Sequence, residues 1–493
     1  MLQKVGLPPL SEGALLKTDA YIDGEWAGAA SRARFGVQNP ADGVEIAKVA
    51  NCTASDTERA IAAAQKALSA WRKKTGKERA AVMRRWFDLI VLHQEDLARL
   101  MTAEQGKPLA ESRGEVAYGA SFVEWFAEEA KRTYGDTIPT TAADKRLLVW
   151  KEAIGVVAAI TPWNFPIAMI TRKVAPAIAA GCTVIVKPAE QTPLSALALA
   201  ELAHRAEIPA GVFNVVTADE ANSIVIGKAL CDSSVVRKLS FTGSTAVGRI
   251  LMQQSAPTLK KLSLELGGNA PFIVFDDAVV DDAVDGAITS KYRNAGQTCV
   301  CTNRFYVHQK IYDEFVQKLA AKAAQMKVGS GFESGVVQGP LIDNHAIEKV
   351  ESHVADAKKL GASVVTGGER HALGGTFYQP TVLANVTDRM MLTREETFGP
   401  VAPVFKFSTD DEAVMAANAT EFGLAAYFYS RDVARVFRVA EQLEFGMVAV
   451  NTGLMSNEVA PFGGIKQSGF GREGSKYGIE EYLVTKYVCL GGI

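Results

Sequence analysis

The stretch Gly155-Val-Val-Ala-Ala-Ile160 is followed by a helical pattern over about 166–180 and then by Thr183-Val-Ile-Val186. Short, continuously apolar runs separated by helices are typical of parallel strands in a sheet that is covered on both faces. The alternation continues through three more segments, a helix over about 193–206, Val212–Val216 and Lys238–Phe241. The sequence therefore predicts an α/β fold, in which ligands bind outside the carboxyl ends of the strands.

Hairpin and helix signals precede this alternation. Tyr21-Ile-Asp-Gly-Glu-Trp26 has an Asp-Gly pair between aromatic and apolar neighbours, which is typical of a small β-hairpin. Thr53 suits the N-cap of a helix, and helical periodicity follows over about 56–74. Two further helical patterns run from about 78 to 103 and from about 110 to 133.

The length and composition describe a globular protein of several domains. A chain of 493 residues exceeds the size at which one core keeps growing, so two or three domains are expected. Hydrophobic residues make up 48% of the chain and charged residues 22%. The net charge of −2 gives no electrostatic footprint for nucleic acid or for an anionic membrane, so we expect neither as a partner.

The cysteines and the N-terminal segment indicate the compartment. The six cysteines are spread over the whole chain, unlike the dense pattern of a secreted disulfide scaffold. The first stretch of the chain lacks the apolar core of a secretory signal and is poor in arginine, and no long apolar run follows. A cytoplasmic protein is expected. The six histidines show no metal-ligand spacing, so no metal is predicted.

The segment Asn294-Ala-Gly-Gln-Thr-Cys-Val-Cys-Thr-Asn303 carries the first candidate for chemistry. Cys299 follows a Gly-Gln-Thr turn and precedes the apolar run Arg304–Val307. A cysteine on a turn between two rigid elements is well placed to act as a nucleophile. Taken alone, a cysteine in such a chain is more often a small buried hydrophobic residue.

Two segments at predicted strand ends suit a phosphorylated ligand. In Phe241-Thr-Gly-Ser-Thr-Ala-Val-Gly248 a strand passes through Gly243 into a helix, so Ser244 and free backbone N–H groups lie where phosphate binds. Lys187 and Glu190 follow another strand, and a carboxylate there suits ribose hydroxyls and repels a 2′-phosphate. Each segment alone is also compatible with an ordinary turn.

Two further residues suit acid–base and oxyanion chemistry. Asn164, in Thr161-Pro-Trp-Asn-Phe-Pro166, has an amide that can donate to an oxygen that becomes negative. Glu265, in Leu264-Glu-Leu-Gly-Gly-Asn-Ala-Pro271, is flanked by leucines, which favours a raised pKa and a role as general base.

Six motifs in this chain resemble, in order, those of the NAD(P)-dependent aldehyde dehydrogenases. They are Pro162–Pro166, Phe241–Ser244, Leu264–Gly268, Gly296–Cys299, Glu395–Pro400 and Pro461–Gly464. The resemblance covers nearly the whole chain, and within the family it is closest to the succinate-semialdehyde dehydrogenases. The stretches that carry this narrower likeness are Met169–Lys173, Arg293–Cys301 and Gly469–Gly478.

The resemblance implies a fold and a division of the chain. It implies a Rossmann-type cofactor-binding domain (1–137 and 155–265), a catalytic α/β domain (266–460) and a small oligomerisation element (138–154 and 461–493). The alternating segment Tyr482–Val488 would pair with another subunit as an edge strand, in a homodimer or a homotetramer.

The resemblance also implies roles for individual residues. Cys299 would be the nucleophile, Asn164 with the backbone N–H of Cys299 the oxyanion hole, and Glu265 the base that activates water. Lys173 matches an active-site lysine, with a plain salt bridge as the alternative. Residues that match contacts to NAD or NADP are Trp163, Lys187, Glu190, Gly243, Ser244, Glu396 and Phe398. Glu190 favours NAD, although a rotated side chain beside Lys187 admits NADP, and we expect both to be accepted.

Substrate choice rests on a smaller set of matches. Arg172 and Arg293 match arginines that bind a substrate carboxylate, which guanidinium groups hold well, and Ser456 lies in a loop that would complete the pocket. The implied reaction is oxidation of succinate semialdehyde to succinate through a cysteine thiohemiacetal and thioester. Alternatives are a glutarate-semialdehyde, proline-pathway or broad-specificity aldehyde dehydrogenase, an acyl-transferring relative and a non-catalytic scaffold protein.

Cys301 adds a further hypothesis. It could form a redox-sensitive disulfide with Cys299, which would need motion of the loop.

Overall fold

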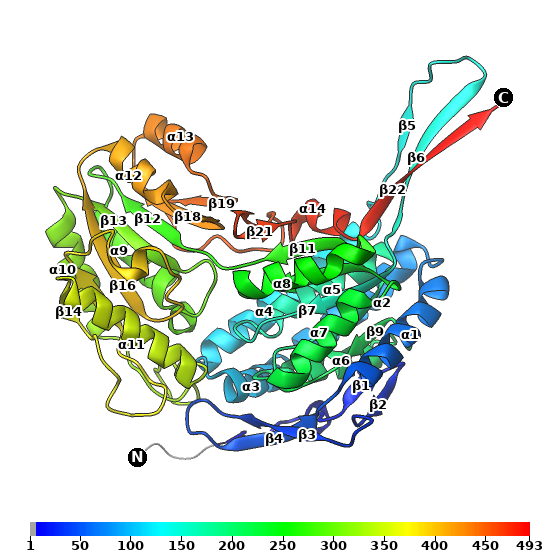
Figure 1. Ribbon diagram of the computed structural model, residues 1–493, viewed down its shortest axis with the longest axis horizontal. Coiled ribbons are helices and arrows are strands. Elements are labelled where there is room, and N and C mark those ends of the chain that lie inside the picture. Colours follow the sequence, from blue (N-terminus) through cyan, green and yellow to red (C-terminus); the bar gives the residue numbers. More distant parts are fainter. Residues whose placement is uncertain (1–5) are drawn as a thin grey trace.

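The computed structural model describes residues 6–493, so residues 1–5 of the first predicted domain lie outside the described residues. Two lobes lie side by side, each built around its own sheet, and a narrow arm extends away from one of them (Figure 1). No helix within residues 6–493 combines the length and the apolar composition that crossing a membrane requires.

The first lobe contains an eight-stranded sheet in the order β2-β1-β9-β8-β7-β10-β11-β21. Strands β9, β8, β7, β10 and β11 are parallel, which confirms the predicted parallel sheet. The bounds are β1 (Ala20–Ile22), β2 (Glu25–Ala27), β7 (Val156–Ile160), β8 (Thr183–Lys187), β9 (Phe213–Val215), β10 (Val236–Thr242), β11 (Lys261–Glu265) and β21 (Gly469–Phe470). The first two strands form the predicted hairpin, with Ile22 opposite Glu25.

Helices cover both faces of this sheet (Figure 1). They are α1 (Ala54–Trp71), α2 (Gly76–Leu92), α3 (Gln94–Gln105), α4 (Leu109–Glu129), α5 (Ala168–Ala180), α6 (Pro193–Arg205), α7 (Glu220–Asp232) and α8 (Thr245–Ser255). Most lie where the sequence predicts a helix. The single helix expected over about 78–103 is wrong, because the chain turns at His93 and begins a new helix. Short elements nearby are η1 (Gly13–Leu15), β3 (Arg34–Gln38), β4 (Glu45–Ala50) and η2 (Ala256–Thr258).

The second lobe contains a seven-stranded sheet in the order β14-β15-β16-β13-β12-β18-β19. Its strands are β12 (Ala270–Val274), β13 (Thr302–His308), β14 (Ser363–Thr366), β15 (Thr381–Ala384), β16 (Val401–Phe407), β18 (Ala425–Tyr429) and β19 (Met447–Val450). The other elements are α9 (Val280–Tyr292), η3 (Arg293–Gly296), α10 (Tyr312–Ala324), α11 (Asn344–Lys359), η4 (Met391–Thr393), α12 (Asp410–Asn418), β17 (Phe422–Gly423) and α13 (Val433–Gln442). Only β14 runs antiparallel to its neighbour.

The C-terminal segment connects all parts of the molecule. Strand β20 (Ile465–Lys466) pairs with β17 of the second lobe, and β21 pairs with β11 of the first. After α14 (Ser475–Glu480), β22 (Leu483–Gly491) enters the arm, where it pairs over nine residues with β6 (Lys145–Ala153). The arm is completed by β5 (Asp136–Ile138), so β22 forms one edge of a three-stranded sheet. Its pairing with another subunit stays a prediction.

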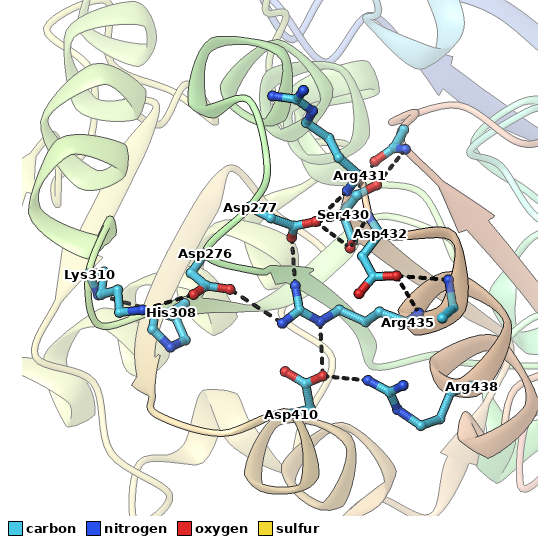
Figure 2. A network of polar contacts seen from close by, with 12 residues as sticks. Asp276, Asp277, His308, Lys310, Asp410, Ser430, Arg431, Asp432, Arg435 and Arg438 are labelled. Atoms are coloured by element: carbon cyan, nitrogen blue, oxygen red, sulfur yellow. Dashed lines mark hydrogen bonds and ion pairs between the residues drawn. The ribbon is translucent and has the colours of Figure 1, made fainter.

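An ionic network fixes α13 against the second sheet (Figure 2). The guanidinium of Arg435, on α13, lies 2.7 Å from Asp277 Oδ1, 2.9 Å from Asp410 Oδ2 and 3.4 Å from Asp276 Oδ1. The side chain of Arg435 is only 17% exposed, so water screens these contacts less than it screens an open surface pair.

Replacing Arg435 with methionine should lower the free energy of unfolding by about 1–3 kcal/mol, because three half-buried carboxylates lose their shared cation. Thermal unfolding followed by calorimetry measures the loss. Arg370→Met is the matched control, since Arg370 pairs with Glu351 on an exposed surface and should cost at most about 1 kcal/mol. Equal losses for the two variants would contradict the importance of the network.

Candidate active site

A cavity of about 350 Å³ lies between the carboxyl ends of the first sheet and the second lobe. Seven of the predicted site residues line it: Trp163, Asn164, Gly243, Ser244, Cys299, Glu396 and Phe398. The first four follow strands β7 and β10, and the last three come from the second lobe. Segments distant in sequence therefore converge on one hollow at the edge of the sheet where ligands of α/β folds bind.

The turn that carries Cys299 has an unusual backbone. Asn294 and Ala295 have φ values of 51° and 55°, and Gly296 follows with 78°. A side chain at Gly296 would meet the backbone of Gly399, with its Cβ 2.2 Å from the carbonyl oxygen, so glycine is required there. The Gln297 side chain accepts from the Ile342 N–H at 2.9 Å and donates to the Asn294 carbonyl at 3.1 Å. These contacts hold the turn in one conformation.

The thiol of Cys299 is half-buried at the cavity wall. Burial raises its pKa to about 12, and the positive charge of Arg172 opposes this rise. The thiol is therefore neutral at neutral pH, and a base must remove its proton before the sulfur attacks a carbon.

Glu265 is buried at the end of β11, and neither carboxylate oxygen has a hydrogen-bond partner within residues 6–493. Burial, followed by the nearby charge of Glu473, holds its pKa well above the ordinary value. This direction agrees with the expectation from the flanking leucines. Close packing joins this segment to the nucleophile turn, because a Cβ at Gly268 would lie 2.6 Å from the Cys299 carbonyl oxygen. An unpaired carboxylate in this position can accept a proton.

Asn164 lies beside the nucleophile turn. Its Nδ2 donates to the Gln297 carbonyl at 3.1 Å, and a primary amide has a second N–H for another acceptor. The Asn164 carbonyl accepts from Lys107 Nζ at 2.7 Å and from Asn294 Nδ2 at 3.0 Å. The amide is thus held at the cavity wall close to Cys299, as an oxyanion donor requires.

Arg172 and Lys173, on α5, share the buried carboxylate of Glu473. Arg172 Nη2 lies 2.6 Å from Glu473 Oε2, and Lys173 Nζ donates to Glu473 Oε1. The Arg172 guanidinium also lies 3.9 Å from the centroid of the Phe462 ring. The structure therefore contains a salt bridge at Lys173, while the catalytic role of Lys173 and a role for Arg172 at a substrate carboxylate stay predictions.

Three other predicted residues surround the nucleophile turn. Arg293 is half-buried, its guanidinium lies 5.3 Å from the centroid of the Phe165 ring, and no carboxylate of residues 6–493 forms an ion pair with it. Ser456 is half-buried in the loop that follows β19, and its neighbour Met455 packs on the same apolar cluster as Cys299. Cys301 is buried, and its thiol donates to the Lys291 carbonyl at 3.6 Å.

We call the residues predicted for a dinucleotide the dinucleotide path; they lie at the carboxyl ends of β7 and of its two neighbours β8 and β10, and in the second lobe. Lys187 Nζ lies 3.6 Å from Glu190 Oε2 just after β8, and Ser244 caps α8 by accepting from the Val247 N–H. Glu396 accepts from the Gly268 N–H at 3.2 Å, and burial raises its pKa to about 7. A helix N-terminus, a buried ammonium and a row of polar side chains suit a phosphate ligand with ribose groups.

Phe398 adds an apolar wall to this path. It lies edge-on to Trp163, with ring centroids 5.6 Å apart, and has a φ value of 54°. A left-handed conformation is rare for a bulky residue and is commonly found where function requires it. The arrangement places two aromatic rings at the cavity that holds Cys299.

Sequence reasoning missed three charged residues near this site. Glu473 is the partner of Arg172 and Lys173, Lys349 lines the cavity, and Lys107 contacts Asn164. Glu473 lies within the motif Gly469–Gly478, but nothing in the local pattern marks it as buried. A buried charge that is neutralised by a distant partner has the same local sequence signature as a surface charge.

Comparison with known proteins decides the family. Residues 26–488 match the model of the aldehyde dehydrogenase family. The chain belongs to the aldehyde dehydrogenase family. It is 62% identical over 484 residues to the 3-sulfolactaldehyde dehydrogenase of Pseudomonas putida, covering 98% of this chain and 99% of that protein. It is also 62% identical over 484 residues to the glutarate-semialdehyde dehydrogenase of Pseudomonas aeruginosa, with 98% and 100% covered.

Two further relatives bear the name expected from the narrower resemblance. The succinate-semialdehyde dehydrogenase [NADP(+)] of Escherichia coli is 60% identical over 482 residues, covering 98% of this chain and 99% of that protein. The crystal structure of the succinate-semialdehyde dehydrogenase from Burkholderia pseudomallei has a TM-score of 0.97 and 62% identity, with 98% and 100% covered. The predicted family and α/β fold are confirmed, and the protein is an oxidoreductase.

Glu265→Gln should slow both the acylation of Cys299 and the hydrolysis of the acyl-enzyme, because glutamine can deprotonate neither the thiol nor water. We expect the first turnover, which forms reduced nicotinamide, and the steady-state rate each to be slower by about 10²–10⁴. Stopped-flow absorbance measures both phases. Since the pKa of Glu265 is raised, the basic form grows with pH, so the wild-type hydrolytic rate should rise with pH in the range of that pKa.

Glu351→Gln, which changes an exposed carboxylate that does not line the cavity, is the control and should retain the wild-type rate and pH profile. A Glu265→Gln variant with the wild-type steady-state rate would show that another group is the base.

Proposed function

We propose that this protein oxidises succinate semialdehyde to succinate with NAD or NADP as the hydride acceptor. The observation that supports this best is the convergence of Cys299 and Asn164 on one cavity, with the unpaired carboxylate of Glu265 directly before Leu266 and Gly267 of the cavity wall. This is the set of groups that acyl chemistry on a thiol requires: a nucleophile, an oxyanion donor and a base.

The reaction begins with the removal of a proton. Glu265 takes the proton of the Cys299 thiol, and the sulfur then attacks the aldehyde carbon. The oxygen of the resulting thiohemiacetal becomes negative and is bound by Asn164 Nδ2 and the backbone N–H of Cys299. A bound nicotinamide dinucleotide would supply the acceptor for the hydride that leaves the former aldehyde carbon. Glu265 releases the thiol proton to solvent, and its carboxylate then deprotonates the water that hydrolyses the thioester and releases the acid.

The residues that would hold the cofactor are those along the path described above. Ser244 and the N-terminus of α8 suit the pyrophosphate, Lys187 and Glu190 suit a ribose, and Glu396 suits the second ribose. Glu190 disfavours a 2′-phosphate, whereas Lys187 attracts it. Acceptance of both NAD and NADP follows from this pair.

The proposed substrate carries a carboxylate at the end remote from the aldehyde. Arg293 is a half-buried cation without an ion-pair partner in the described part of the chain, which suits an anionic ligand. The relatives named above act on succinate semialdehyde, glutarate semialdehyde and sulfolactaldehyde, and each of these aldehydes has an anionic end. Arg172 and Ser456 would complete the pocket. Glutarate semialdehyde, one methylene longer, is the second candidate substrate.

Assembly and location stay predictions from the sequence. A homodimer or homotetramer would form through the arm, in which β22 forms an exposed edge. The cysteines within residues 6–493 are all free, which suits a reducing compartment such as the cytoplasm.

Steady-state kinetics test the proposed substrate. Succinate semialdehyde, glutarate semialdehyde and butanal are compared with NAD and with NADP by absorbance of the reduced nicotinamide. We expect the four-carbon acid to be preferred over the five-carbon acid by about 1–3 kcal/mol in kcat/KM, a typical value for one methylene. Equal turnover of butanal would indicate a general aldehyde dehydrogenase.

Arg293→Met should lower kcat/KM for succinate semialdehyde by about 10- to 100-fold, because a charge-assisted contact of about 1.5–3 kcal/mol is lost. The effect should fall mainly on KM. Butanal serves as the internal control, since its oxidation does not depend on a carboxylate contact. A loss of equal size for butanal would mean that Arg293 supports the fold of the site instead of binding substrate.

We also propose a redox-sensitive pair. Peroxide would oxidise the Cys299 thiolate to a sulfenic acid, and the Cys301 thiol would displace water to form a disulfide. Cys301 must first leave its contact with the Lys291 carbonyl. Activity lost in peroxide should return with dithiothreitol in the wild type but not in Cys301→Ser, and mass spectrometry should find a linked Cys299–Cys301 peptide. Failure of dithiothreitol to restore the wild type would refute the pair.

A further inference from the structure

A buried lysine lies in the turn that connects α3 to α4. Gly106, at φ 93°, begins the turn, and a Cβ there would lie 2.8 Å from the rings of Pro40 and Pro340. Only glycine fits this space, and the tight turn directs the next residue inward. Lys107 is 2% exposed, which is rare for a lysine and requires compensating partners.

The partners of Lys107 are a carboxylate and the backbone of the oxyanion-hole residue. Lys107 Nζ donates to Glu115 Oε2 at 2.5 Å and to the Asn164 carbonyl at 2.7 Å. The ammonium also lies 4.0 Å from the centroid of the Phe165 ring. All three contacts are made inside the protein, where charged hydrogen bonds are strong and their loss is costly.

Glu115 extends this contact to the start of α5. Its second oxygen, Oε1, accepts from the N–H groups of Ile167 and Ala168 at 3.0 and 3.3 Å. The segment from Asn164 to Ala168 is therefore held at one end by the ammonium and at the other by the carboxylate. A single buried ion pair fixes the turn that presents Asn164 to the cavity.

The same turn also reaches the nucleophile loop. Gln105 Nε2 donates to Asn294 Oδ1 at 3.0 Å, and Glu111 Oε2, on α4, accepts from the Asn294 N–H at 2.8 Å. Asn294 in turn donates to the Asn164 carbonyl, the acceptor that Lys107 also uses. The two segments that supply the oxyanion donors thus meet on one side of the α3–α4 connection.

We infer that Lys107, paired with Glu115, is a positioning residue that holds the Asn164 amide at the distance the oxyanion requires. This inference rests on the proposed mechanism, in which Asn164 binds that oxygen. The Lys107 ammonium is enclosed by Glu115, the Asn164 carbonyl and the Phe165 ring, so it acts through Asn164 and does not touch the substrate. An oxyanion donor contributes only when it is placed before the reaction, because reorientation during the reaction would offset its gain.

The test is the double variant Lys107→Met/Glu115→Gln. Removing both charges leaves no unpaired buried ion, and the amide oxygen of the introduced glutamine can still accept from the start of α5. We expect kcat to fall by about 10²-fold, as for loss of one oxyanion donor, with KM little changed. Alkylation of Cys299 by iodoacetamide, followed by mass spectrometry, should keep its wild-type rate because alkylation forms no oxyanion.

A mutant cycle with Asn164→Ala isolates the proposed route. If Lys107 acts through Asn164, adding Asn164→Ala to the double variant should cause little further loss of kcat. Multiplicative losses, an unchanged kcat in the double variant, or a parallel loss of Cys299 alkylation would each overturn the inference.

Lys260→Met is the matched control. Lys260 is also a buried lysine that donates to backbone carbonyls, of Leu230 and Ser233, but it precedes β11 at the end opposite Glu265. It should leave kcat unchanged. Every rate is measured with the aldehyde that the wild type oxidises fastest in the substrate panel. If the wild type does not oxidise succinate semialdehyde, the proposed substrate is wrong. The mutant cycle, measured with another aldehyde, still tests the role of Lys107.

Discussion

The buried carboxylate of Glu473 is the contact on which the arrangement of the site depends. This carboxylate belongs to the C-terminal segment, whose strand β21 pairs with β11. The pairing brings Glu473 near Glu265, the last residue of β11. Charges removed from water are stable only when oppositely charged groups and hydrogen bonds compensate for lost hydration. Arg172 and Lys173 give two cations for one anion, so an ionised Glu265 would bring the four groups to neutrality.

This charge balance explains why Glu265 suits both halves of the reaction. Burial and the charge of Glu473 raise its pKa, whereas Arg172 and Lys173 lower it. These two cations therefore limit how strongly burial and Glu473 hold the proton on the carboxyl group. A fully solvated glutamate would be too weak a base for a thiol of raised pKa, and an isolated buried one would stay protonated.

Much of the fold was predictable because its signals are local. The apolar runs of β7 and β8 and the Asp-Gly turn of the first hairpin each depend on a few adjacent residues. The break between α2 and α3 was not predictable, because no glycine or proline marks it. Asp96, in the first turn of α3, accepts from the N–H groups of Ser11 and Glu12, so a contact across the sequence helps define that helix.

The residues of the candidate site also fall into two groups, those that a local sequence signal marks and those that it does not. Cys299, Asn164 and the residues along the dinucleotide path lie in motifs whose order identifies the family, so they could be named from the sequence. Glu473, Lys107 and Lys349 could not, because a local pattern does not tell a buried charge from a solvated one. Residues within the family motifs are thus easier to predict than charged residues whose burial depends on distant contacts.

The cations near the site, Arg172, Arg293 and Lys107, have different roles, and electrostatics explains the difference. The chemistry requires an anionic sulfur, and the proposed substrate adds a carboxylate to the same cavity, so each anion disfavours the other. Arg172 limits the rise in the pKa of Cys299. Arg293, which lies against the Phe165 ring, forms no ion pair in the described chain, although its charge acts on the Glu111 carboxylate and lowers the pKa of that group against the effect of burial. Lys107 lies against the same ring, but its charge is already neutralised by Glu115. The buried pair can therefore fix the geometry of Asn164 without competing for the substrate, and the substrate's carboxylate is left to a cation that is still unpaired.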